Sequence, residues 1–413
     1  MRRFALILVA SLSALTLVGC GEGGGEAIST TPTPASATRW AIRDLGPGTA
    51  WAINERGQVV IGRAGHVLLW QNGKMRDLGS LGRNWSEAAS IDDGFAGQVV
   101  VGNTISERGQ VVGRSQTGAA HSATSEREST WQSHAFLWES GKMRDLGTLG
   151  GDDSEASAIN EEGQVVGYAD TGAMNKDEIA IFHAFLWEDG HMRDLGTLGG
   201  RMSEAKAISE GGQVVGWADT GAKRASSGSY HAFLWKRGKM RDLGTLGGAN
   251  SRALAINERG EVIGWADTDA TDDGWNTSHA FIWRDGKMRD LGTLGGANSI
   301  ALAINERGDV VGYSEMDKDD PLSKHAFVWR DGKMRDLGTL GGASSVAVGI
   351  NEGDQVIGSA ESRTKASHAF VWHNGTMTDL GEGVVFAINE RGQSVGTSIT
   401  KNRSDRAVLW MKR

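Results

Sequence analysis

Seven histidines stand at the same place in a repeated phrase, and they are the first sign of possible chemistry in this chain of 413 residues. Each heads a stretch that reads H-A-F-x-W in most copies. Imidazole rings that met at one point could bind zinc, but a zinc ligand must lie about 2 Å from the metal. Because the copies belong to separate repeat units, we predict that each ring makes the same local hydrogen bond in its own unit. Arg406, another donor, stands at this place in the last unit; the histidines are His66, His134, His183, His231, His279, His325 and His368.

Acidic side chains gather in two of the segments that differ between the repeats. Calcium prefers several oxygen ligands at one place, but neither segment has the spacing of the twelve-residue calcium loop. The sequence therefore favours solvated acidic loops, with calcium as the one alternative and no other cofactor expected. The candidate metal ligands are Asp267 and Asp269 in one segment and Asp317 and Asp319 in the other.

Aromatic residues in the variable segments are candidates for binding. They could form platforms for a sugar or a partner protein, or they could pack beneath their own loops. The variable segments connect the second and third phrases of each repeat, at Asn103–Ser133, Ala169–Phe182, Ala218–Tyr230, Ala266–Ser278 and Ser314–Lys324. The ligand-binding candidates are Trp131, Phe182, Tyr230, Trp275, Asp272 and Asp273.

An asparagine ends the first phrase of most repeats, at Asn54, Asn160, Asn257, Asn305, Asn351 and Asn389. Such side chains typically begin a turn by bonding to the backbone. Asp92 and Ser209 stand at this place in the other two repeats. Because Asp92 is the only carboxylate there, it is the residue on which an enzyme site at the axial mouth would depend.

Two further patterns have structural explanations. The phrase G-T-L-G-G lacks the Lys-Ser/Thr pair of a phosphate-binding loop and reads as a turn. Six Arg-Asp pairs, the first at Arg76-Asp77, are predicted to be surface or inter-unit ion pairs worth at most about 1 kcal/mol each. We identify no nucleophile paired with a general base in the sequence.

The elements that position these residues are four short phrases repeated eight times, each set ending on a tryptophan of the H-A-F-x-W type and a following M-R-D-L-G phrase. A period in the forties indicates stacked or radially repeated units. Asp-Gly and Asn-Gly pairs, as at Asp285-Gly286, predict hairpins between the phrases. We predict that A-x-A-I-N is the innermost strand a, x-V-V-G strand b, H-A-F-x-W strand c and M-R-D-L-G the outer strand d.

The two ends of the chain complement each other. Residues Arg43–Gly46 form a strand d with no strand before it, and Ala407–Trp410 form a strand c with none after it. We therefore predict an all-β fold over residues 40–413: an eight-bladed β-propeller of four-stranded blades, its ring closed by the N-terminal strand that completes the last blade. Unit two contains two phrases of the strand b type, which indicates an inserted hairpin. An open solenoid is the alternative.

The N-terminal residues read as an export signal. Arg2 and Arg3 precede an apolar run that ends in L-V-G-C, and Cys20 is the only cysteine. Residues 1–20 resemble a lipoprotein signal peptide with a lipobox, in which Cys20 would be lipidated. Residues 21–39 are rich in Gly, Thr and Pro, which is typical of a flexible tether. We expect an exported protein anchored by lipid to the cell envelope, at the outer membrane or cell surface.

The repeat H-A-F-L-W…D-L-G-T-L-G-G…A-I-N…G-Q-V-V-G resembles that of the bacterial extracellular HAF-repeat proteins. The resemblance implies an exported repeat protein and no catalytic residues. A net charge of −8 argues against nucleic acid as a partner. We expect a monomeric, non-catalytic binding or scaffold module whose variable loops on one face contact a protein or polysaccharide. The alternative is a propeller enzyme that acts on a carbohydrate or lactone at the axial mouth.

Overall fold

The computed structural model describes residues 40–82, 86–88, 91–92, 98–99, 104–120, 131–175, 179–221, 229–272, 275–399 and 405–412. All regular elements in these residues are β-strands, which confirms the all-β class. A search of these residues for a helix able to cross a membrane finds none. The predicted signal peptide, Cys20 and the tether lie outside the described residues.

The strands form antiparallel sheets of four, one for each repeat in units one to six, and strand a to strand d follow one another across each sheet. Unit one contains β2 (Thr49–Ile53), β3 (Val59–Arg63), β4 (His66–Gln71) and β5 (Lys74–Asp77). Unit two contains β6 (Ser86–Ala88), β9 (Val111–Ala120), β10 (Trp131–Glu139) and β11 (Lys142–Asp145). Unit three contains β12 (Ser154–Ile159), β13 (Val165–Met174), β14 (Ala180–Glu188) and β15 (His191–Asp194).

The next three units repeat this order. Unit four contains β16 (Ser203–Ile208), β17 (Val214–Asp219), β18 (Tyr230–Lys236) and β19 (Lys239–Asp242). Unit five contains β20 (Gly247–Ile256), β21 (Val262–Asp272), β22 (Trp275–Arg284) and β23 (Lys287–Asp290). Unit six contains β24 (Ser299–Ile304), β25 (Val310–Asp317), β26 (Asp320–Arg330) and β27 (Lys333–Gly338).

Units seven and eight share one seven-stranded sheet, because β31 runs from strand d of one into strand a of the next. In sheet order this sheet contains β28 (Gly341–Ile350), β29 (Val356–Ser362), β30 (Ser367–His373), β31 (Thr376–Ile388), β32 (Ser394–Ile399), β33 (Asp405–Lys412) and β1 (Trp40–Pro47). The pairing of β1 with β33 places the first strand of the chain at the outer edge of the last sheet, with Ile42 opposite Trp410.

The local sequence explains why each repeat folds as four strands. Asp285 and Gly286 both have positive φ, 53° and 82°, as the type I′ turn between β22 and β23 requires. Strand a contains a bulge in unit one and in units three to eight, and in unit five the register shifts between Ala253 and Ala255. The bulge leaves Leu254 unpaired in the ladder, so its side chain turns away from the regular alternation.

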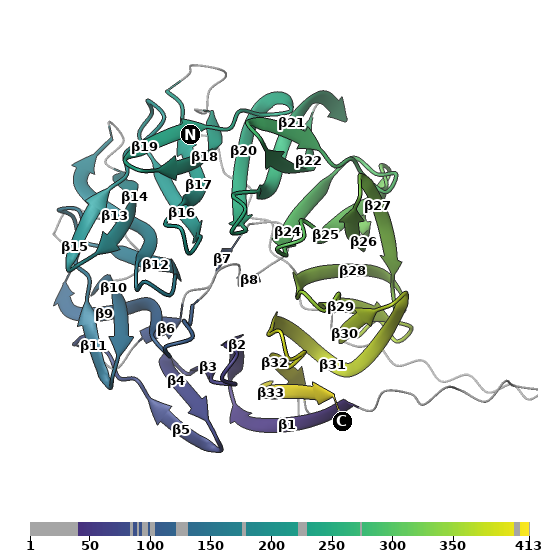
Figure 1. Cartoon of the computed structure of the whole chain (residues 1–413), viewed down its shortest axis with the longest axis horizontal. Helices are drawn as coiled ribbons and strands as arrows, with labels where there is room; N and C mark the ends of the chain where they lie inside the picture. The colour runs from purple at the N-terminus through teal and green to yellow at the C-terminus, as the bar shows by residue number, and fades with distance from the viewer. Residues whose placement is uncertain are drawn as a thin grey trace, which may run out of the picture. The chain divides into compact units, whose positions relative to one another are not determined.

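The core lies between neighbouring sheets, not within one. Phe281 and Trp283 on β22 of unit five pack against Ala207 and Val215 of unit four, and the other units repeat this arrangement. A fully buried phenylalanine of this kind contributes roughly 2–3 kcal/mol. The same contact joins the last sheet to the first, where Leu409 packs with residues of β2 and β4. Figure 1 shows the sheets around a common centre, with strand a on the inner side of each of the larger sheets and β7 and β8 near the centre.

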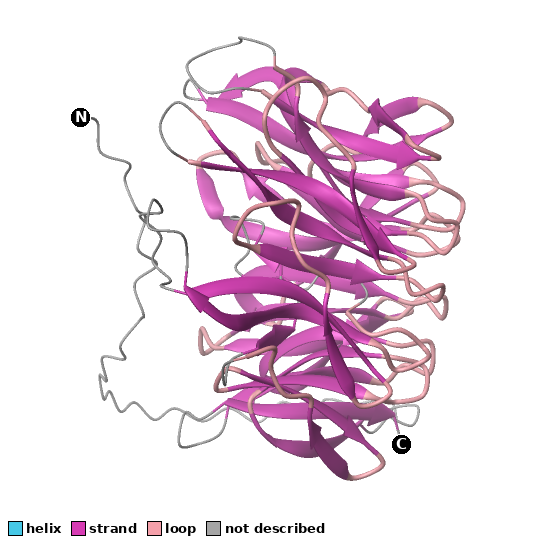
Figure 2. Ribbon diagram, turned by 90° about the vertical axis from the view of Figure 1, so that its left-hand side faces the viewer, coloured by secondary structure: helices cyan, strands magenta, loops and turns pink. Residues whose placement is uncertain are grey.

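Unit two contains the inserted hairpin that its sequence indicates. Ile91–Asp92 forms β7 and pairs with Gln98–Val99, which forms β8, in a separate two-stranded sheet. Strand b of this unit is β9, so the connection to strand c covers 121–130 and not the whole of 103–133. The variable segments of units three, five and six are likewise mostly strand: in unit five β21 extends to Asp272 and β22 begins at Trp275. Figure 2 shows the connections gathered at the two ends of the strands.

Candidate functional site

The end of the strands that carries the turns between strands a and b has a regular polar rim, which we name the turn-side rim. Asn257 accepts the N–H of Glu261 at 3.0 Å and donates to the carbonyl oxygen of Asn305 in the next unit at 3.1 Å. Asn160, Asn351 and Asn389 make the same pair of contacts. The predicted turn-starting role of the asparagines is confirmed, and within the described part of the chain five of the six, all but Asn305, also bond to the next unit.

The prediction that Asp92 occupies this position in unit two is wrong. Asn54 donates to the carbonyl oxygen of Ser106 at 2.9 Å, and Ser106 bonds to Gln110 as the asparagines bond to their partners. Asp92 belongs to β7, in the inserted hairpin. The inserted hairpin separates strand a from its turn in unit two, so sequence order alone misplaced the equivalent residue. The one carboxylate expected at the axial end of strand a is therefore not at that position.

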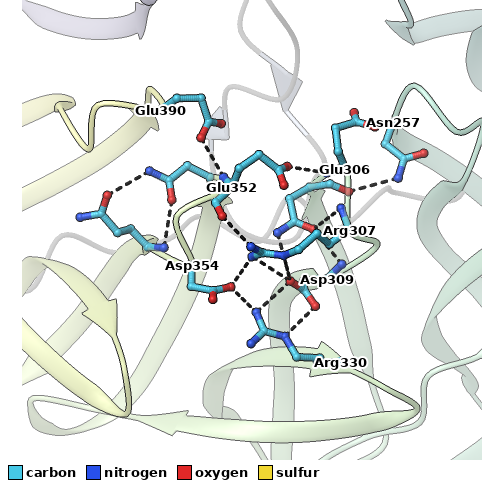
Figure 3. Close-up of polar contacts among 11 residues, drawn as sticks. Asn257, Glu306, Arg307, Asp309, Arg330, Glu352, Asp354 and Glu390 are labelled. Carbon is cyan, nitrogen blue, oxygen red and sulfur yellow. Dashed lines mark hydrogen bonds and ion pairs between the residues drawn. The ribbon is translucent and has the colours of Figure 1, made fainter.

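A glutamate follows each of these residues, and the eight glutamates form the inner part of the turn-side rim, which we name the glutamate cycle. The backbone N–H of each donates to the carboxylate of the next, and Glu390 donates to Glu55. Burial, together with the neighbouring carboxylates, raises the pKa of Glu210 and Glu390. Part of the cycle is drawn in Figure 3; its members are Glu55, Glu107, Glu161, Glu210, Glu258, Glu306, Glu352 and Glu390.

Unit seven departs from the rim pattern at one place. Its turn reads N-E-G-D where units one, five, six and eight read N-E-R-G, so Asp354 takes a position with φ of 62° that glycine fills elsewhere. Its carboxylate pairs with Arg307 and with Arg330, and Arg330 also holds Asp309 at 2.7 and 2.8 Å (Figure 3). Burial opposes ionisation of Asp309, but hydrogen bonds from Arg330 and Asn305 lower its pKa overall. These four charged side chains neutralise one another, so we interpret them as a structural contact that joins units six and seven.

The repeated histidines have the structural role predicted from their spacing. In all seven units the Nδ1 atom lies 2.8–3.0 Å from the aspartate of strand d in the same sheet, as His183 does from Asp194. Arg406 makes the equivalent contact with Asp44 on β1. Burial works against ionisation of Asp194, but hydrogen bonds from His183 and from the N–H of Gly196 lower its pKa.

The predicted Arg-Asp ion pairs are wrong, because the two residues of each pair have different partners. Asp77 bonds to His66, whereas the guanidinium of Arg76 lies over the ring of Trp138 in the next unit, 5.0 Å from its centroid. The same stacking joins five further pairs of units. Strand alternation sends neighbouring side chains to opposite faces, so adjacent residues in a strand do not face each other.

The opposite end of strands a and b has an irregular polar rim in units two to five, which we name the polar arc. Arg114 on β9 contacts Glu87 at 2.7 Å in its own sheet and Glu155 at 3.3 Å in the next. Glu155 accepts a hydrogen bond from the hydroxyl of Tyr168 at 3.0 Å. In unit four, Glu204 binds both the Nζ atom of Lys206 at 2.5 Å and the indole N–H of Trp217 at 2.8 Å.

The arc continues into unit five through aromatic contacts. The guanidinium of Arg252 lies 4.9 Å from the ring of Trp217 and 5.0 Å from that of Tyr230. Tyr230 also meets Trp265 edge to face at 6.2 Å. The Nε atom of Arg252 is buried and has no hydrogen-bond partner among the described residues. A buried donor without a partner costs about 1–3 kcal/mol, which a protein retains only for a reason.

Burial dominates the electrostatics of the arc. It raises the pKa of Glu155, which Arg114 and Tyr168 counteract only in part. It also raises the pKa of Tyr168, with a further contribution from Glu155. Burial alone would lower the pKa of Arg114, but the carboxylates of Glu155 and Glu87 raise it overall. The arc therefore holds alternating charges in a partly dry environment, where interactions with a ligand gain strength.

The arc lies beside the variable segments. Glu204 is the second residue of β16, and Tyr230 is the first residue of β18, directly after the segment that connects strands b and c. Units six to eight have Ile300, Val346 and Val384 at the position of Glu204. At this position of strand a the rim is thus charged in units two to five and apolar in units six to eight. Two sequence positions carried a signal for the arc, because the residue type changes between units at both. One is the strand a position of Glu204, and the other is the position after V-V-G, which holds Tyr or Trp in some units.

Two of the aromatic residues chosen from the sequence lie at or beside the polar arc. Tyr230 belongs to the arc. Phe182 packs edge-on against Tyr168 at 5.5 Å and so adjoins it. The structure places the backbone of Trp131 opposite Ala120, and that of Trp275 opposite Asp272 at the tip of the unit-five hairpin. Asp273 lies outside the described residues.

The acidic candidates do not gather. Asp267 is buried and accepts hydrogen bonds from Asn250 and from Ser278, each at 2.8 Å. Asp269 is exposed, and Asp317 accepts the N–H of Asp319 in a turn. Within the residues that the structure describes, no three His, Cys, Asp or Glu side chains are placed to hold a metal ion. Asp267 instead ties the start of strand a to strand c.

Comparison with known proteins finds similar structures but no family. No protein-family model matches the chain, and no curated protein is similar to it. Similar structures include an acylaminoacyl peptidase of Pyrococcus horikoshii (10% identity, 79% of this chain and 52% of that one, TM-score 0.44) and a puromycin-hydrolyzing peptidase of Mycobacterium tuberculosis (12%, 86%, 58%, 0.46). TolB from Acinetobacter baumannii is another (11%, 74%, 80%, 0.36). The chain spans only 52% and 58% of the two peptidases.

Proposed function

We propose that this protein is a non-catalytic binding module whose ligand contacts the polar arc and the neighbouring connections between strands b and c. The main observation that supports this proposal is that the units differ from one another at the end of the strands where the polar arc lies. At one strand a position units two to five have the charged residues Glu87, Glu155, Glu204 and Arg252, whereas units six to eight have the apolar residues Ile300, Val346 and Val384. A repeat has no structural need for such a difference between units, so selection for a ligand explains it.

The proposal includes the finer architecture. The eight units would be the eight blades of a propeller whose ring is closed by β1. Two observations support this: β1 pairs with β33, and the glutamate cycle returns from Glu390 to Glu55. A ring of this kind has no free sheet edge and holds its inner rim rigid, which lowers the cost of binding a ligand there.

The chemistry of the arc favours a partner with both polar groups and planar or apolar faces. Paired carboxylates and guanidinium groups bind hydroxyl or amide groups, and half-buried rings such as Tyr230 and Trp217 pack against sugar or side-chain faces. A protein or polysaccharide of the cell envelope fits this description. The lipobox at Cys20 and the HAF-like repeats support export and lipid anchoring, with residues 21–39 as the tether, and we include both in the proposal.

A pull-down from cross-linked cell envelopes tests the proposal. The bait is the lipidated protein, compared with two variants: one with 121–130 and 222–228 replaced by short turns, and one with Arg252→Met. The control is Lys287→Glu, an exposed charge change on the hairpin between β22 and β23. We expect one partner to be captured by the wild type and the control and lost from both variants. Equal capture by all four proteins would refute the proposed site.

A further inference from the structure

The second place where a ligand could fit is a cavity inside the ring of strands a. It has a volume of about 270 Å³ and lies among strands a of units three to seven. Ile208, Leu254 and Leu302 form part of its apolar wall, and Glu210, Glu258 and Glu306 of the glutamate cycle also line it. The volume corresponds to roughly nine water molecules, which suits a small ligand.

The carboxylates that line the cavity are only partly neutralised. Glu210 accepts the N–H of Glu161 at 2.8 Å, and Glu258 accepts that of Glu210 at 2.8 Å. Among the described residues neither forms an ion pair with a lysine or arginine. The residue that follows the glutamate is an arginine in five units, whereas units three, four and seven have Glu162, Gly211 and Gly353 there. Of the three glutamates that line the cavity, only Glu210 is followed by a residue other than arginine, and none of the three is paired with a lysine or arginine among the described residues.

These two properties specify a ligand. An apolar wall binds methylene groups, and a line of uncompensated carboxylates binds a cation. A bare metal ion would leave the apolar wall unused, and the carboxylates are not grouped for one. We propose that the cavity binds a primary ammonium group on a linear alkyl chain, with the chain against Leu254 and Leu302 and the ammonium at Glu210 and Glu258. The source is either a free diamine or a lysine side chain of a peptide.

Isothermal titration of the full chain with 1,5-diaminopentane at low ionic strength tests this inference. The key variant is Glu210→Gln/Glu258→Gln, in which the amide oxygens can still accept the backbone N–H groups. The matched control, Glu55→Gln/Glu107→Gln, removes the same charge from a part of the cycle that does not line the cavity. We expect at least a tenfold loss of affinity in the first and less than a threefold loss in the second. Leu254→Lys, which places an ammonium group inside the cavity, should abolish binding.

Three results would overturn the inference: no heat of binding, equal losses in both double variants, or equal binding of 1-pentanol, which has the chain without the charge. A lysine-containing pentapeptide titrated in parallel distinguishes the two sources. If it binds more tightly than the diamine, the natural ligand is a peptide; if only the diamine binds, the ligand is the free amine. This site is separate from the polar arc, so its failure leaves the proposed function unaffected.

Discussion

The turn-side rim and the polar arc lie at opposite ends of the same strands, and they use polar residues in different ways. On the turn-side rim one arrangement recurs: asparagine bonds to its own turn and to the next unit, and glutamate accepts a backbone N–H. In the polar arc the partners change along the units: Glu155 binds Arg114 and Tyr168, Glu204 binds Lys206 and Trp217, and Arg252 stacks on Trp217 and Tyr230.

This difference separates structure from function within one repeat. A contact needed to hold neighbouring sheets together is needed at every junction, so it repeats. A contact made to a ligand is needed once, so it appears in one or a few units. The buried pair of Lys206 and Glu204 illustrates the second case, because units five and six have Leu254 and Leu302 at the position of the lysine. The fold is stable there without any charge.

The largest expected effect on stability is that of Lys206→Met. The size of this effect tests the interpretation of the Lys206–Glu204 pair. The lysine side chain is 5% exposed and Glu204 is 18% exposed. Removal of one partner leaves the other charge buried, and we expect the free energy of unfolding to fall by about 3 kcal/mol. Urea unfolding followed by tryptophan fluorescence measures it. A loss below about 1 kcal/mol would mean that Glu204 is already compensated by Trp217.

The turn-side rim offers a reciprocal pair of changes. Asn257→Ser removes the bond to Asn305 and should cost about 2 kcal/mol, because a buried carbonyl loses its donor. Ser209→Asn, in the neighbouring unit, should add the missing bond to Asn257 and stabilise the protein by about 1 kcal/mol. Both are read from urea unfolding. If Ser209→Asn destabilises the protein, the contacts between neighbouring units on the turn-side rim are not equivalent.

The histidine–aspartate pairs predict a pH optimum for stability. The pKa values of Asp145, Asp194, Asp242 and Asp290 are lowered in the folded state, so their contribution is present above the ordinary aspartate pKa and is lost as the pH falls. The pKa of His183 is raised by its hydrogen bond to Asp194, so its contribution is present below the ordinary histidine pKa and is lost as the pH rises. Thermal unfolding should therefore show maximal stability between about pH 4 and 6.5.

A variant with His183→Gln is the control for this profile. It should lose the part of the decline above about pH 6.5 that belongs to this one pair, while the decline on the acid side persists through the other pairs. A wild-type stability that is flat from pH 4 to 8 would contradict the assignment of the histidines to these structural pairs.

The smallest expected effect concerns the arginines that stack on the next unit. Arg144→Met removes a guanidinium 4.9 Å from the ring centroid of Trp187, and we expect a loss of about 0.5 kcal/mol, since the site is exposed. Arg193 instead lies 3.7 Å from Glu188, so Arg193→Met should change stability by less than about 0.3 kcal/mol. Chemical denaturation of the two variants side by side distinguishes stacking from a general charge effect.

The sequence predicted what is local and repeated. Strand phrases, Asp-Gly hairpins and the hydrogen bond of His134 follow from short-range spacing, and the structure confirms them. It misplaced Asp92 because the inserted hairpin of unit two broke the phrase order on which the alignment of repeats depended. It assigned the wrong partner to Arg76 because the partner, Trp138, lies in the next sheet.

The polar arc could not be assembled from sequence for a related reason. Glu155, Glu204 and Arg252 are separated by about one repeat each, and nothing in a single repeat shows that one strand position faces the same position in the next sheet. Only the sheet-to-sheet packing brings Arg114 to Glu155. The variable segments near the arc were recognised, but their extension of strands such as β21 and β22 was not.

The double variant Lys206→Met/Glu204→Gln tests the central claim most directly. Both charges are removed, the amide oxygen can still accept the indole N–H of Trp217, and the apolar side chain matches the neighbouring units. We predict a free energy of unfolding equal to or above that of the wild type, together with loss of the partner captured in the pull-down. Retention of the partner with wild-type stability would show that the pair serves no ligand, and the account of the polar arc as the binding site would be wrong.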